Sequence, residues 1–157
     1  MSGEPFCVNL VLAFEQREGL IVDLQAGAKV VSLSWGVNPE LIGLARASGA
    51  FVLVQVGTPD EAAAAARAGA DALIVQGVEA GGHVQATRPL VELLREVRPR
   101  VQVALVAAGG IADSTSLKEA RDAGADAVAD GTVFLASHEA DVHPTYLDRL
   151  IARATVA

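Results

Sequence analysis

The sequence predicts one α/β domain in which strands and helices alternate around a parallel sheet. The 157 residues are the length of about one domain, and 52% hydrophobic with 20% charged residues is globular composition. Most apolar residues are Ala, Val and Leu, and only 4% of the chain is aromatic. This favours strands buried on both faces under Ala-rich helices over a β-sandwich. We therefore expect residues 1–157 to form a single domain.

A repeated layout predicts where the strands lie. Each copy runs from a small-Gly-Ala step through an apolar stretch to a second Gly, and the copies are residues 26–36, 48–57, 68–77 and 123–132. The first Gly is typical of a helix C-terminus in the left-handed conformation, and the second Gly of a turn after the strand. Two further strands are predicted at residues 6–12 and 101–108, which makes six.

Helix start signals follow the predicted strands. Asn38-Pro39-Glu40 places a capping side chain before Pro, and residues 58–61 (Thr-Pro-Asp-Glu) do the same with Glu61 completing a capping box. An amphipathic helix is predicted at about 88–98. Strict alternation of strand and helix predicts parallel neighbours joined by right-handed connections. Periodicity alone fits both a (β/α) barrel and an open doubly wound sheet, and the chain is about two units shorter than a complete eight-unit barrel.

Charge and cysteine content indicate which partners the protein could bind and in which cell compartment it is expected. The formal charge of −7 and a pI near 4.8 disfavour nucleic-acid binding, because that affinity comes mainly from Lys and Arg. Cys7 is the single cysteine and lies in the apolar stretch of residues 6–12, so we expect a buried structural thiol. The first 14 residues lack the features of a signal peptide or membrane helix, which predicts a cytoplasmic protein with no membrane partner.

Two glycine turns fall at the C-terminal ends of the last two predicted strands, where parallel α/β folds place their functional groups. They are Gly109-Gly110 and Gly131-Thr132. Adjacent glycines let the backbone approach an anion closely, and the N-terminus of the following helix favours negative charge. A single Gly-Gly turn is most often only a turn. Two such turns on consecutive final units predict a phosphate site.

The loop at residues 76–83 presents His83, which could act as a general base near neutral pH. The alternative is an ordinary histidine of a surface loop. His138 and His143 flank the final helix and are interpreted as surface or capping residues. No histidine pair has metal-ligand spacing, so no metal site is predicted.

Three amides and one tryptophan also lie near predicted strand ends. Asn9, Gln55 and Gln76 could hydrogen-bond a heterocycle or ribityl hydroxyls, or could equally satisfy backbone groups of the loops. Trp35 could form the wall of a ligand pocket or could simply pack.

Six segments together resemble the nitronate monooxygenase family, formerly called 2-nitropropane dioxygenases, whose members are FMN-dependent TIM-barrel enzymes. The segments are FCVNLVL, VVSLSWG, DALIVQGVEAGGH, VALVAAGGIAD, GADAVADGTVFLAS and HPTYLDRL. The resemblance covers almost the whole chain. It implies an incomplete TIM-type (β/α) barrel with about six parallel strands. It also implies a flavin oxidoreductase in which a nitronate passes an electron to FMN and reacts with O2, yielding a carbonyl compound and nitrite.

The resemblance also assigns roles to individual residues. His83 matches the active-site histidine of the family, which faces the nitro compound. The positions expected to contact FMN fall into three groups: Ala80, Gly81 and Gly82 beside the flavin; Gly109, Gly110, Gly131 and Thr132 at its phosphate; and Asn9, Gln55 and Gln76 at strand ends that line the flavin.

Several departures from the family pattern accompany these matches. FCVNL matches what would be the third strand, so the first two units are missing and two strand edges are open. We expect either that a second copy of the chain covers them or that the missing units come from elsewhere. Val133 replaces the usual Arg after the Gly-Thr turn, and Asp130 places a carboxylate beside the predicted phosphate site. Two alternatives stay open: a truncated paralogue that keeps only an anion-binding scaffold, and a related flavin barrel such as an enoyl-thioester reductase.

Overall fold

The computed structural model describes residues 4–154, and its strands and helices alternate along the chain. The strands are β1 (Cys7–Val11), β2 (Val30–Ser34), β3 (Phe51–Val56), β4 (Ala72–Gln76), β5 (Ala104–Ala108) and β6 (Ala127–Ala129). The α-helices are α1 (Arg17–Gln25), α2 (Pro39–Ala47), α3 (Pro59–Ala68), α4 (Leu90–Val97), α5 (Ser114–Asp122) and α6 (Pro144–Ala154). Two 3-10 helices, η1 (Arg98–Arg100) and η2 (Thr132–Ala136), complete the set.

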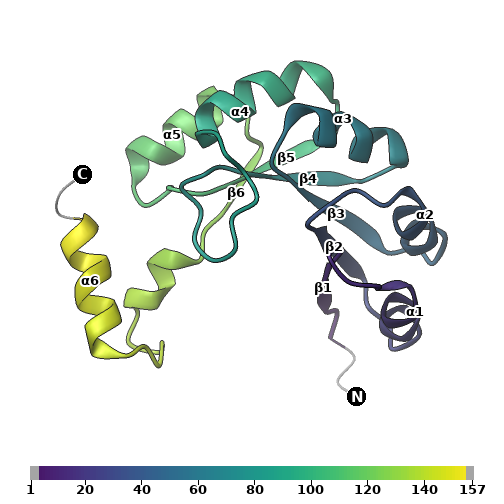
Figure 1. The fold of residues 1–157 in the computed structure, drawn as a ribbon, viewed down its shortest axis with the longest axis horizontal. Coiled ribbons are helices and arrows are strands. Elements are labelled where there is room, and N and C mark those ends of the chain that lie inside the picture. Colours follow the sequence, from purple (N-terminus) through teal and green to yellow (C-terminus); the bar gives the residue numbers. More distant parts are fainter. Residues whose placement is uncertain (1–3, 155–157) are drawn as a thin grey trace.

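The strand order distinguishes a (β/α) barrel from an open doubly wound sheet, the two architectures that fit the sequence periodicity. The six strands pair in sequence order, β1-β2-β3-β4-β5-β6, and every pair is parallel. Helices α1 to α5 follow the outer side of the arc that the sheet forms (Figure 1). A doubly wound sheet would reverse its strand order and carry helices on both faces. The fold is therefore an incomplete TIM-type barrel, as the sequence predicted.

The predicted helix boundaries are confirmed by the caps. The Asn38 side chain accepts hydrogen bonds from the backbone N–H groups of Glu40 and Leu41 at 3.0 and 3.2 Å. Thr58 and Glu61 form the expected capping box at the start of α3. The first glycine of each repeat has a positive φ, between 80° and 108°, which a residue without a Cβ adopts readily; these are Gly27, Gly49, Gly69 and Gly124.

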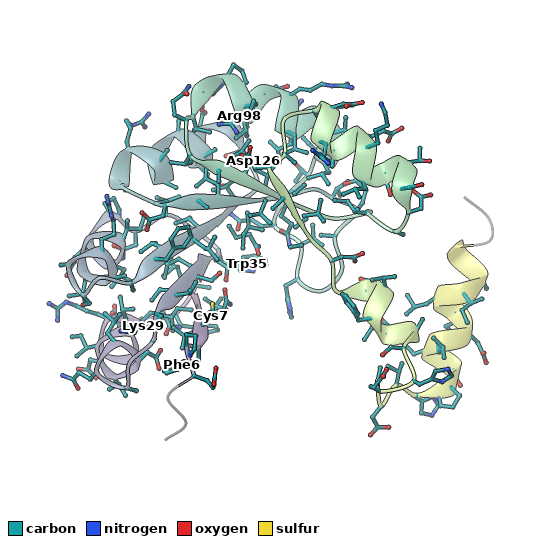
Figure 2. All side chains as sticks on the ribbon, turned by 180° about the vertical axis from the view of Figure 1, so that it is seen from behind. Phe6, Cys7, Lys29, Trp35, Arg98 and Asp126 are labelled. Atoms are coloured by element: carbon teal, nitrogen blue, oxygen red, sulfur yellow. The ribbon has the colours of Figure 1, made fainter. Side chains whose placement is uncertain are left out.

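The Gly-Ala-Asp form of the repeat has a structural role that the sequence did not reveal. The Asp71 carboxylate accepts a hydrogen bond from the Val52 N–H at 2.8 Å, and the Asp126 carboxylate accepts one from the Leu105 N–H at 2.8 Å. Each aspartate thus ties the start of its own strand to the preceding strand. Arg98 pairs with Asp126 at 3.0 Å, and Figure 2 shows the two side chains together.

The two faces of the sheet are buried very differently. The face under the helices is almost fully buried, and its side chains are Val31, Leu33, Val52, Val54, Leu73, Val75, Leu105 and Ala107. On the opposite, concave face, Phe51 is 48% exposed, and Leu53, Ile74 and Val106 are half-buried. The expectation of strands buried on both faces is therefore wrong, because no helix of the described residues covers the concave side.

The two edge strands depart furthest from the prediction. Cys7 is exposed rather than buried, because it lies on β1 at one edge of the sheet, with its side chain on the uncovered face (Figure 2). Strand β6 at the other edge is only three residues long, and all three are exposed. Helix α6 stands apart from the arc of helices α1 to α5 (Figure 1), so it does not cover β6.

Candidate active site

A cavity of about 770 Å³ opens at the C-terminal ends of β4, β5 and β6. Its wall is built mainly by the three loops that follow these strands, together with η2 and one side of α6. The lining includes nine of the residues that the sequence predicts to contact FMN: Gln55, Gln76, Ala80, Gly81, Gly82, Gly109, Gly110, Gly131 and Thr132. Segments from four different units, those of β3 to β6, are therefore brought to one place.

The remaining predicted residues, Asn9 and His83, line a second cavity of about 580 Å³ beside the ends of β1 and β2. The two cavities share three lining residues, Gln55, Gln76 and Gly81. They are therefore neighbouring compartments along the C-terminal edge of the sheet, which is the edge where parallel (β/α) folds bind ligands.

The glycines allow the three loops to pack against one another. A Cβ added to Gly109 would lie 2.8 Å from the backbone nitrogen of Ala80, and one added to Gly81 would lie 2.7 Å from the Thr132 hydroxyl. Gly109 and Gly110 also have positive φ values of 124° and 67°. A larger residue at Gly109 would therefore meet both backbone strain and a close contact. Gly131 differs, since a Cβ there would meet nothing within 4 Å.

Two side chains hold the loop that carries His83. Gln76 donates a hydrogen bond to the His83 carbonyl at 3.3 Å and accepts one from the Gln85 N–H at 2.9 Å. Of the two interpretations of this amide, support of the loop backbone is the one observed. The Glu79 carboxylate accepts hydrogen bonds from the Leu90 N–H at 3.0 and 3.2 Å and so caps α4. Glu79 was missed from the sequence because it lies 11 residues before the helix end that it caps.

His83 lies beside Trp35 in the second cavity. The centroids of their rings are 6.4 Å apart and the ring planes meet at 73°, which is an edge-to-face contact. The other two histidines line neither cavity and are exposed. His143 accepts a hydrogen bond from the Thr145 N–H at 3.3 Å, which fits the predicted capping role. Among residues 4–154, no group of three or more His, Cys, Asp or Glu side chains could hold a metal ion.

The larger cavity offers backbone donors to an anion but no cationic side chain. Neither Lys nor Arg lines it, and Glu79 and Asp130 do. Within the described part of the chain, the amide N–H groups of Gly110 and Gly131 have no hydrogen-bond acceptor. Such donors on neighbouring turns fit a phosphate group, while the Asp130 carboxylate opposes it. Val133, which stands where the family usually has Arg, also lines this cavity and brings no positive charge.

The N-terminus of α5 is capped within its own segment. The Ser116 hydroxyl accepts hydrogen bonds from the N–H groups of Ala112 and Asp113, both at 3.1 Å. The backbone N–H and the hydroxyl of Ser116 donate to the Asp113 carboxylate and hold its pKa below the ordinary value. An anion in the larger cavity would therefore depend on the loop amides of Gly110 and Gly131 more than on the first amides of α5.

These features define an incomplete (β/α)-barrel protein with two adjoining cavities at the C-terminal ends of its strands. Residues 2–157 match the family model for nitronate monooxygenase. The chain belongs to the nitronate monooxygenase family.

Individual relatives agree with the family assignment. A nitronate monooxygenase of Pseudomonas aeruginosa is 35% identical in an alignment that covers 90% of this chain and 43% of the relative. A (3aS,4S,5R,7aS)-5-hydroxy-7a-methyl-1-oxo-octahydro-1H-indene-4-carboxyl-CoA dehydrogenase of Rhodococcus jostii is 35% identical over 98% of this chain and 43% of its own length. The solved nitroalkane oxidase of Streptomyces ansochromogenes superimposes with a TM-score of 0.80 at 34% identity, covering 95% of this chain and 56% of that one. The chain thus spans less than half the length of these two curated relatives.

Proposed function

We propose that the protein is an FMN-dependent oxidoreductase that oxidises alkyl nitronates with O2 to a carbonyl compound and nitrite. The observation that carries this proposal is the pair of adjoining cavities that share Gln55, Gln76 and Gly81. One cavity has glycine turns with free amide donors, and the other has an imidazole. A ligand with a phosphate at one end and a ring at the shared boundary would bring the ring next to His83.

The residues of this chain bind and orient the reactants. The amides of Gly110 and Gly131 would hold the FMN phosphate, with Gly109 and Thr132 shaping the same turns. Ala80, Gly81 and Gly82 would contact the flavin, and Asn9, Gln55 and Gln76 would line it at the strand ends. When bound, FMN would supply the electron transfer and the reaction with O2. The His83 imidazole accepts a proton from the nitro compound or donates a hydrogen bond to its oxygen.

Family membership supports a flavin oxidoreductase over the main alternative, a scaffold that binds an anion but performs no chemistry. The curated relative and the solved nitroalkane oxidase named above act on nitro compounds according to their names. Asp130 and Val133 are the two residues of this chain that favour the scaffold alternative. The expected cytoplasmic location and absence of nucleic-acid partners stay predictions. No helix within residues 4–154 is long and apolar enough to cross a membrane.

A second candidate substrate is a coenzyme A thioester. The dehydrogenase of Rhodococcus jostii is as similar to this chain as the Pseudomonas nitronate monooxygenase is, at 35% identity, and its name specifies a carboxyl-CoA substrate. The two candidate activities use the same proposed flavin site, so they differ only in the substrate that binds beside His83. Assays of the purified protein with a nitronate and O2, and with a saturated acyl-CoA and an artificial electron acceptor, distinguish them.

The first experiment is an absorption spectrum of the purified protein with and without added FMN. We expect a bound flavin spectrum, because the two cavities proposed for the phosphate and the ring share lining residues. Gly131→Ala tests the phosphate site, since φ at Gly131 is −127° and the new methyl meets no protein atom within 4 Å. We expect this variant to fold normally and to bind FMN about tenfold more weakly. Gly43→Ala, in α2 and also in open space, is the matched control and should bind FMN as the wild type does.

His83→Ala tests the imidazole separately from the flavin. We expect this variant to keep FMN and to lose nitronate oxidation by about two orders of magnitude or more, the usual contribution of a positioned acid–base group. Retained activity would remove His83 from the mechanism. A colourless protein that takes up no FMN but binds inorganic phosphate would support the scaffold alternative instead.

A further inference from the structure

Trp35, which lines the second cavity, has an unusual backbone conformation. It is the single tryptophan of the chain and follows directly after β2. Among residues 4–154, it is the only residue other than glycine with a positive φ, which is 65°. A bulky L-residue is strained in this region, and such strained residues cluster at active sites and ligand-binding sites. Figure 2 shows Trp35 on the inner side of the sheet.

The direction of the Trp35 side chain brings it to His83. The edge-to-face contact between the two rings, at 6.4 Å between centroids, links the end of β2 to the loop after β4. His83 is exposed, and its loop is held at the backbone by Gln76 but not at the imidazole. The indole is therefore the aromatic group that restricts where the imidazole can point.

The rest of the second cavity is lined by both apolar and polar side chains. Its apolar lining side chains are Val11, Ala13, Phe14 and Trp35. Phe14 is 72% exposed and Trp35 is 39% exposed, in a chain with only 4% aromatic residues. On the polar side, the amide of Asn9 donates to the Ser34 hydroxyl at 3.4 Å, so these two groups partly satisfy each other.

We infer that Trp35 is a positioning and specificity residue: it orients the His83 imidazole and, with Phe14, forms an apolar wall for the hydrocarbon part of the substrate. This inference rests on the proposed function, because it takes the second cavity as the substrate compartment. A small polar head group sits against His83, and an alkyl chain lies along the indole and the Phe14 ring. The substrate class is therefore nitroalkanes and nitronates with a chain of several carbons, favoured over those of two carbons.

The contact between Trp35 and His83 is tested by NMR without any assay of activity. The chain has three histidines, and the His83→Gln variant identifies which imidazole C–H resonance belongs to His83. We expect this resonance to shift when the indole ring current is removed in Trp35→Ala, and to stay near its wild-type position in Trp35→Phe. Trp35→Gly removes the ring while placing glycine at the positive φ, which keeps the test valid if Trp35→Ala folds poorly.

The apolar wall is tested by equilibrium binding of 1-nitrohexane and nitroethane, followed at the same His83 resonance, in protein as purified and with added FMN. We expect Trp35→Ala and Trp35→Gly to weaken 1-nitrohexane binding roughly tenfold, with less than about a twofold change for nitroethane. Trp35→Phe should keep most of the wild-type preference for 1-nitrohexane over nitroethane. Phe14→Ala, at a largely exposed side chain, should weaken 1-nitrohexane binding in the same selective way.

Two results would overturn the inference: a His83 resonance that does not move in the Trp35 variants, or equal effects on the two nitroalkanes. Failure of the proposed function gives a different pattern. In that case the NMR shift and the chain-length selectivity are present, while the protein neither binds FMN nor oxidises a nitronate.

Discussion

Asp130 is the residue whose charge most directly opposes the proposed cofactor. It precedes Gly131 and lines the larger cavity, where neither Lys nor Arg is present. A carboxylate about 6 Å from a phosphate costs about 3 kcal/mol per unit charge at an effective dielectric near 20. Asp130 is exposed, so water and salt reduce this to the scale of a surface charge pair, below about 1 kcal/mol. At the proposed site, the carboxylate would therefore weaken FMN binding without preventing it.

We predict that Asp130→Asn tightens FMN binding about two- to fivefold at low salt, because it removes the repulsion and keeps the side-chain shape. Titration of flavin fluorescence measures the dissociation constant. The gain should shrink at high salt, since screening already weakens the repulsion in the wild type. Asp122→Asn, at the far end of α5, is the control for net charge and should leave FMN affinity unchanged. An equal gain in both variants would show that Asp130 acts only through net charge.

At the scale of elements, the carboxylates of the Gly-Ala-Asp repeats fix the starts of strands. Asp71 satisfies the backbone N–H of fully buried Val52, and Asp126 does the same for Leu105. In the first two copies of the repeat this position is Lys29 and Phe51, whose backbone N–H groups donate to the Phe6 carbonyl at 3.1 Å and the Lys29 carbonyl at 2.9 Å. The starts of β2 and β3 are thus joined to the preceding strand by backbone pairing alone, whereas the starts of β4 and β6 each have a carboxylate bond in addition.

We predict that Asp71→Ala lowers the free energy of unfolding by about 1–2 kcal/mol, because it leaves the buried Val52 N–H without an acceptor. Urea unfolding followed by circular dichroism measures the change. Asp60→Ala is the matched control, since the Asp60 carboxylate is 95% exposed and makes only a surface ion pair with Arg100. That control should change stability by less than about 0.5 kcal/mol. Equal effects of the two substitutions would contradict the proposed role of the Gly-Ala-Asp carboxylates.

At the scale of the whole molecule, the concave face and both sheet edges are uncovered. In a closed (β/α) barrel, the inward side chains of the strands fill the interior in layers. Here Phe51 is 48% exposed on that face, and β1 and β6 each present an unpaired edge. Exposed parallel edges and apolar side chains favour association. This is the physical basis for expecting a homo-oligomer.

We predict that the 157-residue chain forms an oligomer whose mass, measured by size-exclusion chromatography with light scattering, is at least twice that of the monomer. Phe51→Glu should shift the protein toward the monomer, because it places a charge on the apolar concave face. The helix content of this variant should stay at the wild-type level, since Phe51 lies on the concave face of the sheet, which no described helix covers. The control Val22→Glu changes a more exposed apolar residue on α1 and should leave the mass unchanged. A well-behaved wild-type monomer would contradict the prediction.

Much of this protein could be predicted from the sequence because the relevant signals are local. The caps at Asn38 and Thr58, the positive-φ glycines of the repeats and the alternation of strand and helix each depend on residues within a few positions of one another. The same holds for the glycine turns after β5 and β6. Family membership also follows from short motifs, which is why the expected fold class and family are both confirmed.

Only the tertiary structure decided which segments meet and which faces are covered. The exposure of Cys7, the cap that Glu79 places on α4, and the contact of Trp35 with His83 all depend on residues distant in sequence or on the position of a strand in the sheet. The same apolar strand pattern fits a strand covered on one face or on two, so periodicity could not reveal the open concave side. Sequence determined the units and the motifs that they carry, and long-range packing determined how those motifs were assembled into two adjoining cavities.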